Sequence, residues 1–172
     1  IACGGSKKQT GGPKGPPPLP ANGIQIAIPE TEIAPGEDRQ TCWFTTFESD
    51  EDVWISGFEA FQPSGGHHII AFRSLEDVAD GTVIDCTDGS AMALWMPLLL
   101  AQDVTGLELP EGYGIKIPAK AKLVFQSHYV NTSSEPIKTR DYVNINYAPD
   151  QDNIIGAAPF ANSVLDLTVA PN

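Results

Sequence analysis

The strongest constraint on the fold is a series of short segments in which apolar and polar residues alternate. In a β-strand successive side chains point to opposite faces, so a period of two marks strands that bury one face. Each of these segments is rich in β-branched or aromatic residues and is bounded by Gly, Pro, Asn or Asp. Eight of them predict strands: Ile24–Ile28, Thr41–Ser49, Val53–Phe61, His67–Arg73, Gly114–Ile117, Lys122–Val130, Tyr142–Tyr147 and Leu165–Val169.

Helical spacing is sustained over no stretch longer than Ser90–Leu100, and Pro97 interrupts that one. About eight short strands with no helices between them predict an all-β fold, an antiparallel β-sandwich or jelly roll. The 172 residues suffice for one such domain and are too few for two ordinary ones. We therefore expect residues 24–172 to form a single sandwich.

The first 23 residues have a different composition. They contain much Gly and Pro and too little apolar surface to form a helix or a core strand. We expect an irregular tether, partly polyproline II, that could bind protein partners. The opening "IAC" resembles the end of a bacterial lipoprotein signal, in which the cysteine becomes the acylated N-terminus.

On that interpretation Cys3 carries a lipid, which anchors the protein to a membrane. The protein would lie in the bacterial cell envelope, periplasmic, held at the outer membrane or on the cell surface. Two residues, Ile1 and Ala2, precede the cysteine. Either they belong to the precursor, or Cys3 is a free thiol and the segment is a cloning remnant.

Charge and hydropathy exclude two classes of partner. The 22 acidic and 10 basic residues give a formal charge of −12, which repels a phosphate backbone and excludes nucleic acid. The longest apolar run, Ala91–Ala101, is too short for a membrane span and is interrupted by Pro97. We therefore expect no transmembrane helix.

Two of the three cysteines are candidates for a disulfide. If Cys3 carries a lipid, Cys42 and Cys86 remain as an even number in an exported chain. Such a pair predicts a disulfide.

The chain has three histidines, His67, His68 and His128. Three imidazoles suffice for a zinc or copper ion if the fold brings them together. Alternation within Lys122–Val130 places His128 on the face that also carries Val124, Gln126 and Val130. Taken alone, this partly buried setting favours an ordinary core histidine over a metal ligand.

The adjacent pair poses a geometric problem, because neighbours on a regular strand point to opposite faces. His67 and His68 can reach one ion if the backbone is irregular there, and the preceding Gly65 and Gly66 supply that freedom. Alternatively, one ring coordinates through Nδ1 and the other through Nε2. Spacing alone leaves open whether the three histidines form a site.

Five stretches occur in an order that resembles a known family: "PGEDRQTCWFTTF", "GGHHIIAF", "CTDGSAMALWMP", "LPEGYGIKIP" and "LVFQSHYVN". Over about residues 24–148 the chain is similar to the N-terminal domain of the copper type II, ascorbate-dependent monooxygenases, which include peptidylglycine α-hydroxylating monooxygenase and dopamine β-monooxygenase. The resemblance implies a disulfide-bearing β-sandwich with an electron-transfer copper held by His67, His68 and His128. It also implies that Cys42 and Cys86 pair.

The chain departs from the family in one respect. The family's second, oxygen-activating copper uses a His-x-His pair and a methionine, whereas this sequence has no histidine after His128 and no methionine after Met96. The final "VLDLTVAPN" resembles the junction to the family's second domain. We therefore expect a monooxygenase-like copper protein that does not hydroxylate substrates as this chain alone.

The sequence leaves other interpretations open. Zinc could occupy the same three ligands, because imidazole discriminates weakly between the two metals. Met92 and Met96 fit core packing beside Trp95 better than metal ligation. A different class of function is a structural or accessory lipoprotein subunit of an envelope complex, with the metal site empty or structural.

Overall fold

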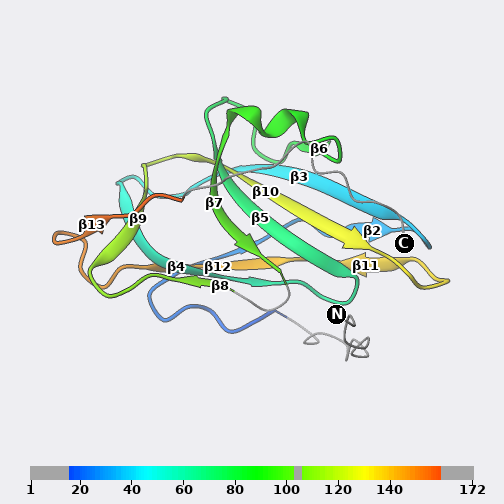
Figure 1. The fold of residues 1–172 in the computed structure, drawn as a ribbon, viewed down its shortest axis with the longest axis horizontal. Helices are drawn as coiled ribbons and strands as arrows, with labels where there is room; N and C mark the ends of the chain where they lie inside the picture. Colours follow the sequence, from blue (N-terminus) through cyan, green and yellow to red (C-terminus); the bar gives the residue numbers. More distant parts are fainter. Residues whose placement is uncertain (1–15, 103–105, 160–172) are drawn as a thin grey trace, which may run out of the picture.

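The computed structural model describes residues 16–102 and 106–159 and confirms an all-β fold (Figure 1). Two sheets pack face to face as a sandwich, and all but one of the strand pairs are antiparallel. Cys3, most of the expected tether and the expected strand Leu165–Val169 lie outside the described residues. Over the described ranges there is no helix of a length and hydropathy suited to crossing a membrane.

The six-stranded sheet follows the path β1 (Gly23–Ala27), β12 (Tyr142–Tyr147), β4 (Val53–Phe61), β9 (Tyr113–Ile117) and β13 (Ile155–Gly156), with β8 (Gly106–Glu108) also paired to β4. The five-stranded sheet has the order β6 (Val83–Asp85), β3 (Asp38–Thr46), β10 (Lys122–Val130), β5 (Gly66–Ser74) and β7 (Trp95–Ala101). A separate ribbon pairs β2 (Thr31–Ile33) with β11 (Ile137–Thr139).

The longer strands lie where the alternation predicts them. Val53–Phe61, Lys122–Val130 and Tyr142–Tyr147 have the predicted bounds, and the strand expected at Thr41–Ser49 begins earlier, at Asp38, and ends at Thr46. Alternation did not reveal the strands of two or three residues, because so few residues show no period. These are β2, β6, β8, β11 and β13.

The helix-like stretch Ser90–Leu100 divides into two elements. A short 3-10 helix, η1 (Ser90–Leu94), leads directly into β7, which contains Pro97. Proline lacks the N–H that a central strand needs, but β7 is an edge strand of its sheet, and its register with β5 shifts between Ala71 and Phe72, beside Pro97. The proline is therefore accommodated at a sheet edge.

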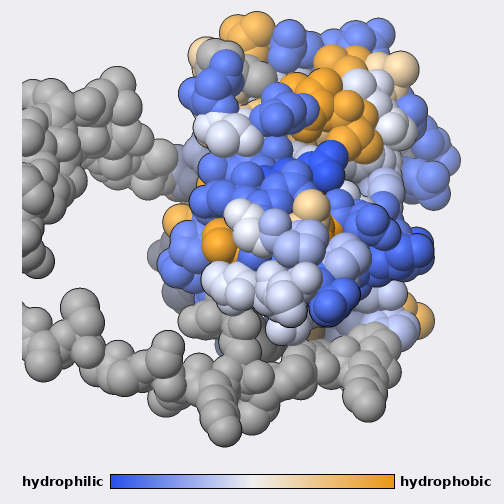
Figure 2. Space-filling model, turned by 90° about the vertical axis from the view of Figure 1, so that its right-hand side faces the viewer, coloured by the Kyte–Doolittle hydropathy of each residue, from blue (hydrophilic) through white to orange (hydrophobic). Residues whose placement is uncertain are grey.

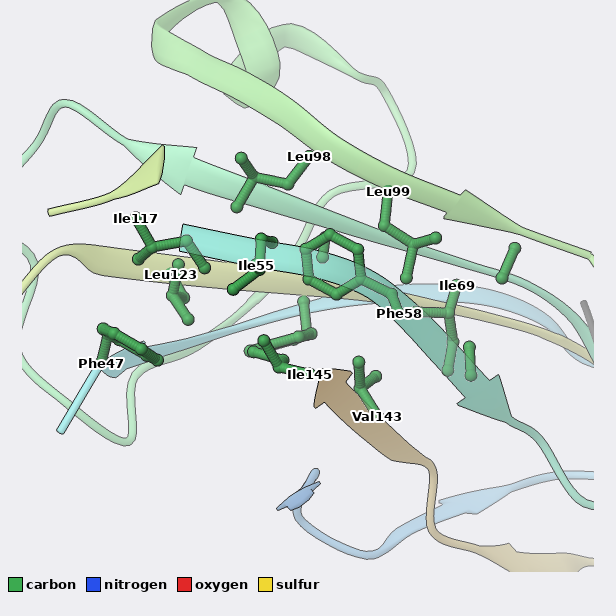
Figure 3. Close-up of a cluster of buried hydrophobic side chains, with 14 of the residues drawn as sticks. Phe47, Ile55, Phe58, Ile69, Leu98, Leu99, Ile117, Leu123, Val143 and Ile145 are labelled. Atoms are coloured by element: carbon green, nitrogen blue, oxygen red, sulfur yellow. The ribbon is translucent and has the colours of Figure 1, made fainter. Parts of the chain in front are cut away.

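The main core fills the space between the sheets (Figure 3). Residues of both sheets point into it, among them Ile55 and Phe58 of β4, Ile69 of β5 and Leu123 of β10. These four side chains are at most 1 % exposed. Burying a side chain of this size contributes roughly 1.5–3 kcal/mol, so the inward faces fix which way each strand is turned.

A second, smaller core lies on the outer face of the five-stranded sheet. Val124, which points away from Leu123 on β10, packs there with Phe44, Phe72 and Trp95. Figure 1 shows η1 and β6 above this face. The segment between β5 and β7 therefore covers one end of the outer face.

The Cys42–Cys86 disulfide expected from the sequence is present within this second core. Both cysteines are fully buried. The bond ties β3, an inner strand of the sheet, to the residue that follows the edge strand β6. It therefore holds the covering segment against the sheet.

A buried carboxyl lies on the other side of β10. Asp141 is 2 % exposed and accepts hydrogen bonds from the Tyr129 hydroxyl and from Gln62 Nε2. The Tyr129 hydroxyl in turn accepts one from Thr139. Burial raises the pKa of Asp141 to about 7, because a charged carboxylate is poorly solvated there.

The described end of the proline-rich segment rests on the protein itself. The carbonyl of Pro17 accepts a hydrogen bond from Gln25 Nε2, and that of Pro18 accepts one from Asn144 Nδ2. Pro17 is buried by this contact. Strands β1 and β12 therefore hold residues 17 and 18.

Removal of the disulfide should destabilise the fold strongly. The bond closes a loop with a sequence separation of 44, for which the chain-entropy relation gives roughly 4 kcal/mol. The double variant Cys42→Ala/Cys86→Ala should lose about that much free energy of unfolding in urea, whereas Cys3→Ala, which leaves the pair intact, should not. Equal stability of the double variant and the wild type would contradict this expectation.

The stability of the protein should depend on the protonation of Asp141. Between about pH 4 and pH 7 the folded protein keeps a proton that the unfolded chain has lost, so this group's contribution falls as pH rises. With a folded pKa of about 7 against 3.8, the loss by pH 8 is roughly 4 kcal/mol. Asp141→Asn should match the wild type near pH 4 and exceed it near pH 8 in urea unfolding. Parallel stability curves for the two proteins would rule this out.

Candidate metal centre

The three histidines come from two paired strands in the middle of the five-stranded sheet. On β10 the outward residues Val124, Gln126 and His128 follow one another, as the sequence predicts. His128 lies directly opposite His68 of β5 and, on its other side, opposite Gln40 of β3. Directly paired residues have Cβ atoms about 4.5–5.5 Å apart, so the register alone brings two imidazoles together.

A β-bulge in β5 brings the third histidine, His67, to the other two. The pairing of β5 with β10 runs from His128 opposite His68 to Tyr129 opposite Gly66, so His67 has no partner on β10. An extra residue of this kind bends the strand and releases its side chain from strict alternation. Backbone irregularity, the first of the two solutions that the sequence allowed, is thus the one that the structure uses.

Two glycines make the bulge feasible. Gly65 has φ 91°, a conformation that residues with a Cβ rarely adopt. At Gly66 a Cβ atom would lie 2.5 Å from Cβ of Gln62 and 3.1 Å from the carbonyl oxygen of Pro63. Neither position accepts a larger residue without a shift of the chain, so the glycines set the geometry of the histidine pair.

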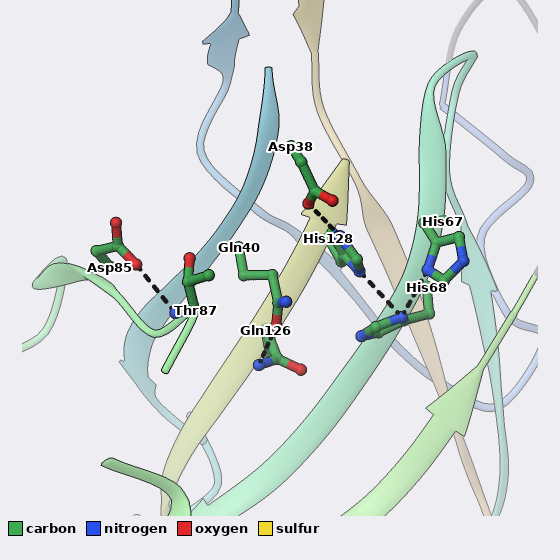
Figure 4. Close-up of polar contacts among 8 residues, drawn as sticks. All are labelled: Asp38, Gln40, His67, His68, Asp85, Thr87, Gln126 and His128. Atoms are coloured by element: carbon green, nitrogen blue, oxygen red, sulfur yellow. Dashed lines mark hydrogen bonds and ion pairs between the residues drawn. The ribbon is translucent and has the colours of Figure 1, made fainter. Parts of the chain in front are cut away.

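The ring nitrogens converge (Figure 4). His67 Nδ1 lies 3.0 Å from His68 Nδ1, which lies 3.4 Å from His128 Nδ1. One ring nitrogen from each of the three histidines lies within 4.8 Å of the others. Two ligands that each lie about 2 Å from one ion are at most about 4 Å apart, and the His67–His68 and His68–His128 distances meet this limit. The trio could therefore hold a metal ion.

The three rings differ in exposure. His128 is 8 % exposed, His68 is half-buried and His67 is exposed. Figure 2 faces the end of the molecule where β10 ends, and that surface is largely hydrophilic. An ion can therefore reach the trio from the side of His67, and His128 is the most deeply buried of the three rings.

The free protein offers at least one neutral imidazole at neutral pH. Burial lowers the pKa of His68 below its usual value, and the neighbouring His128 and His67 lower it further, against a hydrogen bond with Gln126 that raises it. A metal binds the unprotonated form of imidazole, so this shift favours ligation.

The surrounding residues separate the trio from the sulfur atoms. Gln126 Nε2 donates to Gln40 Oε1 at 3.1 Å and lies 3.7 Å from both Cys86 Sγ and Met92 Sδ. Met92 packs against the second core, in agreement with the core role expected for it, and Met96 is 47 % exposed on the edge strand β7. The core packing expected of Met96 is therefore wrong.

The sequence analysis missed one polar partner of the site. Asp38 Oδ1 lies 2.7 Å from His128 Nε2. Asp38 falls outside the strand that was predicted to begin at Thr41. The signal that would have found it is register, because Asp38 and Gln40 continue the outward series of Cys42 once β3 is extended.

Comparison with known proteins adds no assignment. No protein-family model matches the chain, and a search of curated proteins finds no match. The resemblance to the copper monooxygenase domain therefore depends on the residues themselves.

The bulge can be tested at Gly65. Gly65→Ala should cost about 1 kcal/mol or more, because of its positive φ, and should also weaken metal binding by about tenfold by moving His67. Gly81→Ala is the matched control, since Gly81 has φ 83° and open space around it. Unfolding in urea and calorimetric titration with Zn²⁺ separate the two effects. If both variants bind the ion equally well, the bulge does not position the ligands.

Proposed function

We propose that this protein is an exported copper-binding β-sandwich whose His67, His68 and His128 hold one copper ion for electron transfer or copper handling. The observation that carries the proposal is the bulge that places His67 Nδ1 within 3.0 Å of His68 Nδ1, beside His128. Two adjacent histidines that did not bind a common ion would not require that irregularity.

The donor set favours copper among the common divalent ions. All three donors are imidazole nitrogens, and for a given site of this kind affinity for the divalent first-row metals is highest for Cu²⁺. The family resemblance of the "GGHHIIAF" and "LVFQSHYVN" stretches points to the same ion. Zinc is the alternative metal, and competition between Zn²⁺ and Cu(II) distinguishes the two.

The residues divide the work of holding the ion. His128, buried and in contact with Asp38, provides a fixed ligand, and His68 provides a half-buried one. His67, exposed on the bulge, is the ligand through which an ion enters and leaves. Bound copper would supply one-electron chemistry by cycling between Cu(II) and Cu(I).

Export to the cell envelope belongs to the same proposal. Disulfides persist in oxidising compartments and are rare in the cytosol, so the Cys42–Cys86 bond supports it. A lipid on Cys3 would serve as the anchor. Mass spectrometry of Cys3 in protein taken from the membrane fraction tests that part separately.

Copper binding is tested with tag-free protein, because the chain has only three histidines of its own. We expect one Cu(II) per chain, with nitrogen hyperfine structure in the EPR spectrum. His68→Ala should lower the affinity by more than the 10–100-fold that the loss of an outer partner of a ligand costs. Met92→Leu, which replaces the thioether that lies 3.7 Å from Gln126 Nε2 with a side chain of similar volume, should bind like the wild type.

Two results would contradict the proposal. One is unchanged Cu(II) affinity in His68→Ala. The other is a bound Zn²⁺ that stoichiometric Cu(II) does not displace, which would assign the three ligands to zinc.

A further inference from the structure

We infer that Asp38 is a positioning residue of the proposed site, fixing the tautomer of His128 and lowering the reduction potential of the bound copper. The inference rests on the proposed function, since it concerns the ion held by the three histidines. Asp38 itself does not belong to the convergent trio.

The contact follows from the register of the sheet. His128 is paired with Gln40 and Val130 with Asp38, so Asp38 is the diagonal neighbour of His128 on the outer face. Its Oδ1 lies 2.7 Å from Nε2 of His128, a length typical of a hydrogen bond with a charged partner (Figure 4).

The chemistry of the pair assigns the proton. A carboxylate only accepts hydrogen bonds, so Nε2 of His128 carries the hydrogen and donates it to Asp38. Nδ1 is then the nitrogen with the free lone pair, and this is the nitrogen that lies 3.4 Å from His68 Nδ1. The contact thus selects the tautomer that can bind a metal on the side where the other two histidines lie.

Within the described part of the chain, no lysine or arginine forms an ion pair with Asp38. The adjacent Arg39 donates to the carbonyl of Glu32 and faces the carboxylate of Glu37 at 3.7 Å. The side chain of His128 is 11 % exposed, whereas that of Asp38 is 65 % exposed. The negative charge therefore acts on the buried ring from its outer edge.

A carboxylate behind a ligating imidazole makes the ring a stronger donor. The additional negative charge stabilises the 2+ ion more than the 1+ ion, since the attraction scales with charge. Loss of this charge should therefore weaken Cu(II) binding more than Cu(I) binding. The potential of the bound ion should rise as a result.

The test compares Asp38→Asn, which keeps an oxygen acceptor but removes the charge, with Asp38→Ala, which removes both. Asp85→Asn is the control: Asp85 is exposed on β6, accepts from the Thr87 amide and lies apart from the histidines in Figure 4. Cu(II) and Cu(I) affinities are measured by competition with chelators selective for each oxidation state, and the potential is measured by voltammetry.

We expect Asp38→Asn to bind one copper with its ratio of Cu(II) to Cu(I) affinity lowered at least about tenfold, which equals a rise of about 59 mV. Asp38→Ala should show an equal or larger change, with altered EPR parameters, and Asp85→Asn should match the wild type. Failure of the wild type to bind copper would overturn the proposed function. Normal binding by the wild type with an unchanged ratio in both Asp38 variants, or the same change in Asp85→Asn, would overturn the role of Asp38 alone.

Discussion

The pairing of β5 with β10 is the interaction on which the rest of this structure depends. From His68 to Arg73 of β5 the two strands keep a regular register. This register turns Ile69 and Leu123 into the main core and fixes both strands at the centre of their sheet. On the N-terminal side of His68, between His68 and Gly66, the register shifts by one residue. The regular part thus supplies the rigidity, and the irregular part lets two adjacent residues of one strand present their rings together.

The two faces of β10 have different environments, and the site uses the outer one. On the inner face Leu123 and Phe125 pack in the core between the sheets, whereas the outer face is covered at one end by the segment that the Cys42–Cys86 disulfide ties down. Between the covered end and the solvent-exposed end lie Gln126 and then His128. The imidazoles therefore lie at a boundary, where a ring can be held by packing and still be reached from water.

The sequence predicts the parts of the structure that depend on local pattern. Alternation identifies the long strands and the face of His128, and the odd number of cysteines identifies the disulfide once Cys3 is set aside. The sequence also identifies Gly65 and Gly66 as the source of backbone freedom beside the histidines.

The choice between a bulge and mixed Nδ1 and Nε2 ligation depends on register with a strand sixty residues away, which no local pattern contains. The same is true of Asp38, whose contact exists because Val130 pairs with it. Pro97 misled the assignment of its stretch, because the rule against proline in strands does not hold at a sheet edge.

The central claim is that three imidazoles of one chain bind a single copper ion. X-ray absorption spectroscopy of the protein loaded with one equivalent of copper tests it most directly, because the outer-shell scattering of imidazole rings counts the histidine ligands. Three nitrogen scatterers at about 2 Å are expected, all from imidazole and with no sulfur. A fit that requires fewer than three imidazoles, or a sulfur ligand such as Met92, would contradict it.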